Sequence, residues 1–291
     1  MKEKKMSVAK GILFTVLTLL LATVLTEFGI EFGEMAFSPL TARGGDGIQF
    51  VVMYASFIGV WVLVLLVSLI GKENRKLFAA LKFKKSRVKK SVCLGLIAGI
   101  GVNLLVGLVA MAHGDIQLSF NSFNPAMLLL FLLVVVIQSG AEELVTRWFI
   151  YQRVKRYFPN CPAVAILANA LLFGVLHLAN PGVTLLSVLN ICVVGILYSL
   201  MVHYFDSFWG AVIAHTTWNY CQSILLGLPN SGIVSKYSLF KLNAASAANS
   251  FTYNVGFGIE GTILTVVLLS ILMAALFCFG RKYKAMKFAA A

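Results

Sequence analysis

Apolar residues in this chain fall into long continuous runs, not into the short alternating pattern of half-buried strands. Eight runs can be distinguished, at residues 11–31, 49–70, 91–112, 124–150, 162–180, 183–204, 208–226 and 256–280. Each is close to the roughly 20 residues that an α-helix needs to cross the hydrocarbon core of a bilayer. The pattern therefore predicts an all-α, polytopic membrane helical bundle with about eight transmembrane helices.

The polar segments between these runs contain no repeat, Ser/Gly-rich linker or low-complexity tract. We therefore expect one membrane domain with three consecutive parts. Residues 1–90 hold two runs and a basic loop, residues 91–226 hold the five central runs, and residues 227–291 hold a polar loop, the last run and a basic tail. The loop at 227–255 is rich in Gly, Ser and Asn, and we expect it to be external and mobile.

Composition agrees with this class of protein. Hydrophobic residues make up 59% of the 291 residues and charged residues only 12%, with a mean hydropathy of +0.89. A soluble core could not bury that much apolar surface. The five cysteines are scattered in or beside the apolar runs, so we expect buried thiols and neither a disulfide framework nor a zinc knuckle.

The basic residues that give the formal charge of +13 cluster at alternate ends of the apolar runs. Twenty of the 24 Lys and Arg residues lie before the first run, in the loop at 71–90, after the fourth run or after the last run. Those at the opposite ends are Arg43, Lys236 and Lys241. The positive-inside rule then places both termini and the 71–90 loop in the cytoplasm. We expect contact with anionic lipids of a bacterial plasma membrane, and no nucleic-acid partner.

The first run resembles the core of a secretory signal, because it follows the basic residues of positions 1–10. It is longer than a typical signal core. We expect it to be retained as the first span.

Ionisable and amide side chains interrupt three of the runs. They are Glu142, Glu143 and Arg147 in the fourth run, His177 in the fifth, and His215 and Asn219 in the seventh. Such groups are costly in hydrocarbon, and those that persist commonly mark a functional site. Two acids, two histidines and an amide are the components of a hydrolase, which predicts an active site inside the bundle.

The spacing of the motif predicts different roles for the two acids. Glu143 and Arg147 are four residues apart, so they lie on one helical face and can form an ion pair. Glu142 points in another direction and is free to face a cavity as a general base. The alternative is that all three residues form a charge cluster where the helix leaves the membrane.

The histidines repeat the one-turn spacing. Phe173 lies four residues before His177, and Asn219 lies four residues after His215. A single histidine in a membrane helix is more often a hydrogen-bonding partner between helices than a catalyst. Two of them on separate runs, together with a carboxylate pair, favour a catalytic site. His113 and His203 lie in a loop and at a turn, and we expect no role for them.

These residues form three ordered motifs, E-E-x-x-x-R, F-x-x-x-H and H-x-x-x-N. In this order they resemble the CAAX protease and bacteriocin-processing (CPBP, or Abi) family of intramembrane glutamic endopeptidases. The resemblance covers about residues 90–226. It implies a membrane protease in which Glu142 deprotonates a water held by His177, while His215 and Asn219 stabilise the oxyanion. Glu143, Arg147 and Phe173 become supporting residues, and no cofactor is needed.

The resemblance also implies a hydrophobic peptide or membrane-protein substrate, and a role in bacteriocin immunity or peptide maturation. Two alternatives remain open. Glu142, His177 and His215 offer the three ligands of an open zinc site, which would make the protease metal-dependent. A non-catalytic transporter, chaperone or immunity protein would use the same polar residues to line a pathway.

One difficulty concerns depth. Regular full-length spans place His177 near the external end of the fifth run and His215 nearer the cytoplasmic end of the seventh. The two can meet only if the helices are tilted and the break at 180–182 lies inside the protein, or if the helix boundaries differ by a turn or more. We favour the tilted arrangement. It predicts that Glu142, His177, His215 and Asn219 converge on one cavity.

Overall fold

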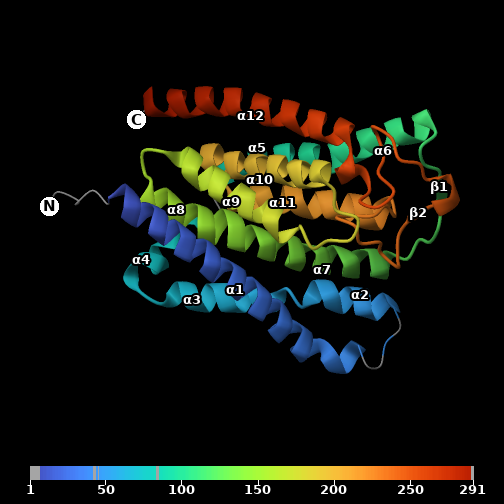
Figure 1. The fold of residues 1–291 in the computed structure, drawn as a ribbon, viewed down its shortest axis with the longest axis horizontal. Coiled ribbons are helices and arrows are strands. Elements are labelled where there is room, and N and C mark those ends of the chain that lie inside the picture. Colours follow the sequence, from blue (N-terminus) through green and yellow to red (C-terminus); the bar gives the residue numbers. More distant parts are fainter. Residues whose placement is uncertain (1–6, 42–43, 45, 83–84, 290–291) are drawn as a thin grey trace.

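The computed structural model describes residues 7–41, 44, 46–82 and 85–289. They form a bundle of roughly aligned helices with one small hairpin at its end (Figure 1). Core residues such as Ala22, Val106 and Leu197 are fully buried between the helices. Several of the basic residues used above to predict topology lie outside the described residues: Lys2, Lys4, Lys5, Arg43 and Lys84.

The first part of the chain builds one side of the bundle. Its helices are α1 (Val8–Thr41), α2 (Asp46–Ala55), α3 (Ile58–Leu69) and α4 (Lys72–Arg75), followed by a 3-10 turn (Lys76–Leu81), α5 (Lys85–Leu96), a π-helical turn (Ile97–Gly101) and α6 (Val102–His113). Helices α2 and α3 are the two halves of one span, separated by a short break.

The second part carries the three motifs. It contains strand β1 (Leu118–Phe120), α7 (Pro125–Glu143), a π-helical segment (Leu144–Ile150), α8 (Tyr151–Tyr157), α9 (Pro162–Leu176), α10 (Leu185–Phe205), α11 (Phe208–Asn219) and a second π-helical segment (Tyr220–Leu225). Strand β2 (Phe240–Leu242), two 3-10 turns (Ala244–Ser246 and Ile259–Gly261) and α12 (Ile263–Ala289) complete the chain. The all-α prediction is confirmed, apart from the antiparallel β1–β2 pair.

Each of the eight apolar runs contains helix, but the expected eight spans are not confirmed. Among the described residues, six helices are long and apolar enough to cross a membrane, and Pro162–Leu176 is a shorter apolar helix. The seventh run, α11 with its π-helical continuation, is not one of the six. The last run was placed too early, since α12 begins at Ile263 and residues before it form a 3-10 turn.

Helix α1 crosses α3 in close contact because small residues face each other there. A side chain on Gly33 would meet the backbone oxygen of Ser56 at 1.9 Å, and one on Gly59 would meet that of Gly29 at 2.0 Å. Gly29 and Gly33 are four residues apart, which is the small-residue spacing of closely packed membrane helices. This crossing holds α1 against the α2–α3 span and so fixes one wall of the site described below.

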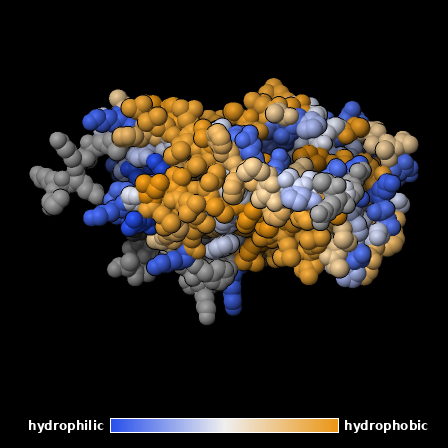
Figure 2. Space-filling model, turned by 90° about the horizontal axis from the view of Figure 1, so that it is seen from below, coloured by the Kyte–Doolittle hydropathy of each residue, from blue (hydrophilic) through white to orange (hydrophobic). Residues whose placement is uncertain are grey.

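The outer surface has the polarity that a bilayer requires. Hydrophobic side chains cover the middle of the molecule, and hydrophilic ones gather toward its two ends (Figure 2). The start of α1 and the last turns of α12 lie at the same end, beside α4 and α8 (Figure 1). The hairpin that contains Lys241 lies at the opposite end. The basic residues of α4, α8 and the two terminal helices therefore share one end of the bundle, and Lys241 lies at the other.

The loop at 227–255, which we expected to be external and mobile, packs over the end of the bundle, where β2 pairs with β1 and Leu118 aligns with Leu242. Tyr253 and Phe257, in the loop and just beyond it, are fully buried. Polar residues without helical or strand periodicity can still fold compactly when neighbouring helices supply the apolar surface. We call residues 227–262 the cap.

Candidate active site

The two acids lie at the end of α7, where the helix becomes π-helical. The Asn124 side chain accepts hydrogen bonds from the backbone N–H groups of Ala126 and Met127, and Pro125 occupies the first turn, so α7 has a defined start. Its last residues are Glu142 and Glu143, and the π-helical turn follows at once. Single π-helical turns are frequent at functional sites, because they shift the direction of side chains relative to a regular helix.

Glu143 is completely buried and is paired twice. Its Oε1 lies 3.1 Å from Nη1 of Arg147, whose side chain is also fully buried. The same oxygen lies 3.0 Å from Nδ1 of His215. The Arg147 guanidinium also packs over the ring of Phe173, 4.7 Å from its centre. The expected Glu143–Arg147 ion pair is therefore present, and it lies inside the bundle instead of at a membrane interface.

His215 lies between the two glutamates. Its Nδ1 faces Glu143, and its Nε2 is 3.6 Å from Oε2 of Glu142. Because a carboxylate only accepts hydrogen bonds, Nδ1 carries the proton that is donated to Glu143. The other ring nitrogen is thereby directed at Glu142, which is 19% exposed, whereas Glu143 is 0% exposed. The histidine therefore contacts a fully buried acid, Glu143, through Nδ1 and approaches a more accessible acid, Glu142, with Nε2.

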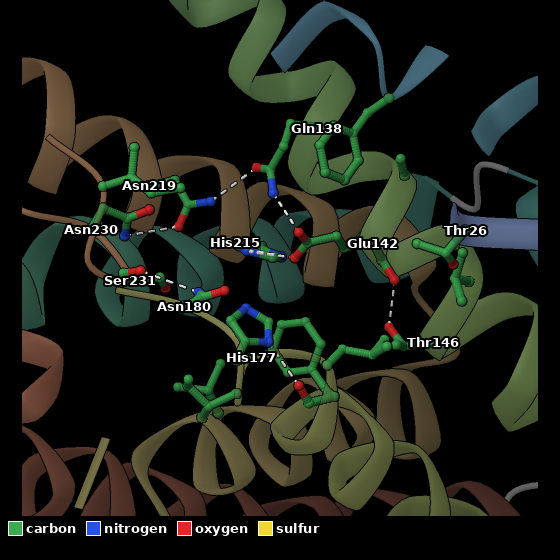
Figure 3. Close-up of a pocket in the computed structure, with 18 of the residues that line it drawn as sticks. Thr26, Gln138, Glu142, Thr146, His177, Asn180, His215, Asn219, Asn230 and Ser231 are labelled. Atoms are coloured by element: carbon green, nitrogen blue, oxygen red, sulfur yellow. Dashed lines mark hydrogen bonds and ion pairs between the residues drawn. The ribbon is translucent and has the colours of Figure 1, made fainter. Parts of the chain in front are cut away.

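Glu142 has one occupied oxygen and one without a hydrogen bond. Oε1 accepts from Nε2 of Gln138 at 2.5 Å, which holds the carboxylate from one side. Oε2 has no hydrogen-bond partner in the part of the chain that the structure describes. Figure 3 shows this carboxylate directed into the same space as His177 and His215. It has the geometry of a base that can accept a proton from a molecule in the cavity.

His177 is the C-cap residue of α9, not an internal residue of a full-length span. Its Nδ1 lies 2.7 Å from the backbone oxygen of Phe173. A carbonyl oxygen only accepts, so Nδ1 carries the hydrogen and Nε2 of a neutral ring keeps its lone pair. The Phe173 ring packs edge-on against His177 at 4.6 Å and against His215 at 5.9 Å. Phe173 therefore helps to orient both histidines.

The short α9 removes the difficulty of depth. The helix has 15 residues and ends at Leu176, four residues earlier than the apolar run. The following turn remains against the protein, since Nδ2 of Asn180 donates to the backbone oxygen of Ser231 and Asn180 lines the cavity. An irregular segment is tolerated at this depth when it lines a cavity. Both explanations raised from the sequence contribute, because the boundary is earlier and the break is internal.

Asn219 is connected to Glu142 through Gln138. Its Nδ2 lies 3.1 Å from Oε1 of Gln138 and 3.2 Å from Oγ of Ser139. Both of its N–H groups are therefore engaged. Its Oδ1 accepts from Nδ2 of Asn230 at 3.3 Å. The amide cannot donate to a new acceptor unless one of these contacts is released, and the Ser139 contact is the longer.

The cap completes this polar network. Asn230 also donates to Oε1 of Glu260 at 3.2 Å, and the same oxygen accepts from Nε1 of Trp218 at 2.7 Å. The other oxygen of Glu260 accepts from the backbone N–H of Ser231 at 2.5 Å. A continuous chain of hydrogen bonds thus runs from Glu260 in the cap, through Asn230, Asn219 and Gln138, to Glu142.

All four residues that the motifs marked as reactive line one cavity of about 270 Å³. Glu142 enters it from α7, His177 from the end of α9, and His215 and Asn219 from α11. Helices α1, α2 and α10 and the cap supply the remaining walls. The expected convergence is therefore present in the structure, whereas the catalytic role of each residue stays a prediction.

The zinc-dependent alternative concerns three of these residues. Among the described residues, no group of three or more His, Cys, Asp and Glu side chains is placed to hold a metal ion. Glu142, His177 and His215 were the ligands considered from the sequence. Both histidines use Nδ1 for a protein acceptor, an arrangement that metal-bound histidines share, and Nε2 of His215 lies 3.6 Å from Oε2 of Glu142.

Sequence reasoning missed several polar residues of the cavity. Gln138 lies one helical turn before Glu142, and Glu27 and Asn190 interrupt the first and sixth apolar runs. The criterion that selected the six motif residues would have found all three. Asn230 and Ser231 carry no such signal, because they occur in a polar loop. His113 contacts Asp115, and His203 contacts Tyr151; neither residue lines the cavity.

A polytopic bundle with a glutamate–histidine site enclosed by its helices defines an integral membrane protein with the groups of a hydrolase. Residues 124–221 match the family model described as Type II CAAX prenyl endopeptidase Rce1-like. The match begins at the N-cap of α7, ends just after α11 and includes every motif residue. The match covers about a third of the chain and agrees with the family that the three motifs resemble. No curated protein and no solved structure matched the chain.

Proposed function

We propose that this protein is an intramembrane glutamic endopeptidase that hydrolyses a peptide bond in a hydrophobic peptide or membrane-protein segment. The observation that carries the proposal is the convergence of Glu142, His177, His215 and Asn219 on one cavity within the bundle. Oε2 of Glu142 has no hydrogen bond among the described residues, and the side chain is 19% exposed whereas that of Glu143 is fully buried, which supports Glu142 as the base.

In the first step, Glu142 takes one proton from water, while Nε2 of His177 accepts a hydrogen bond from the O–H group that remains. The water oxygen forms a bond to the substrate carbonyl carbon, and the carbonyl π electrons move to its oxygen. The C–N bond then breaks, and the proton on Glu142 passes to the leaving nitrogen. The products are a carboxylic acid and an amine, and no covalent enzyme intermediate forms.

The oxyanion is assigned to His215 and Asn219, since donors directed at developing charge in a dry site contribute strongly to catalysis. Nδ1 of His215 is already engaged with Glu143, so donation from Nε2 requires the protonated ring. The adjacent Glu143 carboxylate would balance that positive charge, as the acidic member of a catalytic triad does. Asn219 would donate after exchanging its contact with Ser139 for the oxyanion.

Substitution of Glu142 by Gln tests this proposal, because it keeps the shape and removes the base. Membranes from cells with wild-type protein and with Glu142→Gln are compared by proteomics for new peptide termini. Loss of a general base commonly costs about 10²–10⁴-fold in rate. Glu73→Gln, at an exposed cytoplasmic-end glutamate, is the matched control. Termini that persist in Glu142→Gln would exclude Glu142 as the base, and the absence of termini that depend on the wild-type protein would favour the non-catalytic transporter or immunity protein.

Metal dependence requires a separate experiment. We expect purified protein to keep its activity after treatment with a chelator. Loss of activity that zinc restores would replace the glutamic mechanism by the zinc-dependent one, with Glu142, His177 and His215 as ligands.

The cellular setting is also a proposal. We infer a bacterial plasma membrane with both termini in the cytoplasm, supported by the basic residues at one end of the bundle. At that end a groove is lined by Lys76, Arg153, Lys155 and Arg156 together with the carboxylates Glu73 and Asp206, so its excess of basic residues suits anionic lipid headgroups. A role in bacteriocin immunity or peptide maturation rests on the family resemblance.

A further inference from the structure

Asn190 is a buried amide on the wall of the catalytic cavity that the proposed chemistry does not use. It lies on α10, is 1% exposed and lines the cavity. Its Oδ1 has no hydrogen-bond partner among the described residues. Leaving a buried amide oxygen unpaired costs free energy, so such a group in a native structure calls for an explanation.

Asn169 shows what a structural asparagine looks like in the same bundle. It is fully buried on α9, and its Nδ2 donates to the backbone oxygen of Ala165 at 2.8 Å. Its Oδ1 accepts from Oγ of Ser199 at 3.0 Å. Asn169 does not line the cavity and has both ends satisfied. Asn190 differs from Asn169 in lining the cavity and in having an unpaired amide oxygen, so a molecule in the cavity can supply the missing hydrogen bond.

Glu27 is a second unexplained polar residue on the cavity wall. It is an exposed residue of α1, and with Thr26 and Ile30 it forms the α1 side of the cavity. Glu31 and Glu34 line an adjoining groove of about 500 Å³ that shares Met53 with the cavity. No Lys or Arg in the described part of the chain lines either space. A carboxylate within a span is stable only where water or a cation compensates it.

We propose that the catalytic cavity contains a substrate subsite in which Asn190 hydrogen-bonds a peptide group of the substrate and Glu27 receives a positively charged group. An amide presents one acceptor and two donor hydrogens, which matches the N–H and C=O groups of an extended peptide. The substrate class is therefore a hydrophobic polypeptide with a basic group near the scissile bond. This inference rests on the proposed function.

Neither residue belongs to the three motifs, and Glu27 lies outside the matched segment at 124–221. They are thus suited to selecting the substrate of this particular chain, while the motif residues perform the reaction. The negative charge at Glu27 would also repel acidic segments, so the site would select basic substrates both by attracting them and by excluding acidic ones.

Binding is measured in the inactive Glu142→Gln protein, so that it does not depend on turnover. The probe is a fluorescent hydrophobic peptide with one lysine, in detergent micelles, compared with the same peptide carrying norleucine. We expect the lysine peptide to bind about tenfold more tightly, equivalent to about 1.4 kcal/mol. Glu27→Gln should abolish that preference, and Glu27→Lys should transfer it to a glutamate peptide. Glu73→Gln is the control and should keep the preference.

The Asn190 contact is tested by Asn190→Leu in the same background, with Asn169→Leu as its matched control. We expect Asn190→Leu to weaken binding of both peptides about tenfold while the Tm stays the same or rises, because an unpaired buried amide is removed. Asn169→Leu should lower the Tm, because it removes both hydrogen bonds of a fully buried side chain. A structural Asn190 would instead show a lower Tm and unchanged binding.

The outcomes separate the two levels of inference. Cleavage that persists in Glu142→Gln overturns the proposed function. Loss of cleavage in that variant, together with equal binding of the lysine and norleucine peptides, overturns the role of Glu27 alone. Unchanged peptide affinity in Asn190→Leu overturns the role of Asn190.

Discussion

Nδ1 of His215 lies 3.0 Å from Oε1 of Glu143, and the same glutamate pairs with Arg147 at 3.1 Å. The second acid of the E-E-x-x-x-R motif is therefore shared between a cation on its own helix and a histidine on α11. This joins two motifs that are 72 residues apart in sequence. It also explains why the doublet contains two acids, since one holds the histidine and the other remains free to face the cavity.

We expect Glu143→Gln to lower both stability and activity. Removal of one member of a fully buried ion pair leaves the other charge uncompensated, which typically costs about 3–5 kcal/mol. The double variant Glu143→Gln with Arg147→Leu should recover much of that stability, since the unpaired charge is gone. It should not recover activity, because His215 still lacks its carboxylate partner. Thermal unfolding and peptide cleavage, measured on the same preparations, check this. Recovery of activity in the double variant would show that Glu143 serves only to neutralise Arg147.

Gln138 is expected to position the base. Gln138→Leu removes the 2.5 Å contact to Glu142 and the acceptor for Asn219, so kcat should fall by at least about tenfold with a smaller change in KM. Gln222→Leu is the control, because Gln222 is also fully buried but bonds to the backbone oxygen of Pro229 and does not line the cavity. That control should lose stability without a selective loss of kcat. Equal effects of the two variants would refute a positioning role for Gln138.

Glu260 is expected to hold the cap against the site. It accepts from Trp218, Asn230 and Ser231, and replacement by Leu would leave these donors unsatisfied. Hydrogen exchange at residues 228–233 should become faster in Glu260→Leu, and cleavage should decline with it. Asn243→Ala alters an exposed turn of the same cap away from the cavity and should leave exchange at 228–233 unchanged. Unaltered exchange in Glu260→Leu would mean that apolar packing alone holds the cap.

Asp115 connects the end of α6 to the cap, and its hydrogen bonds should make the stability of the protein depend on pH. Burial raises the pKa of its carboxyl, but hydrogen bonds from Ser250, Thr252 and His113 outweigh burial and leave the pKa below its ordinary value. The unfolded chain therefore takes up a proton first as the pH falls. The stabilisation is present above the unfolded pKa of about 4 and is lost as the pH falls through the lower folded value. The difference in Tm between wild type and Asp115→Asn should be constant near neutral pH and shrink below about pH 4. A difference that persists in strong acid would contradict this.

The apolar runs correctly predicted the class of fold, because a chain that crosses a lipid bilayer must satisfy its backbone hydrogen bonds within helices of similar length. They predicted the ends of the helices less accurately. The fifth apolar run continues past Leu176, where α9 ends, and the last apolar run begins before Ile263, where α12 starts. Local composition cannot report where a helix stops when the next segment is also enclosed by protein. The packing of the cap against the bundle was not predicted for the same reason, since its Gly, Ser and Asn residues are held by contacts with distant helices.

The sequence by itself determined the three one-turn motifs, the Glu143–Arg147 pairing and the family, because each depends on residues a few positions apart on one helix. Only the tertiary structure decided that His215 lies between the two acids, that Gln138 connects Glu142 to Asn219, and that Glu260 reaches the site from the cap. Those contacts join residues 42 to 81 positions apart. They depend on how α7, α9 and α11 pack and where each helix ends, which no local pattern encodes.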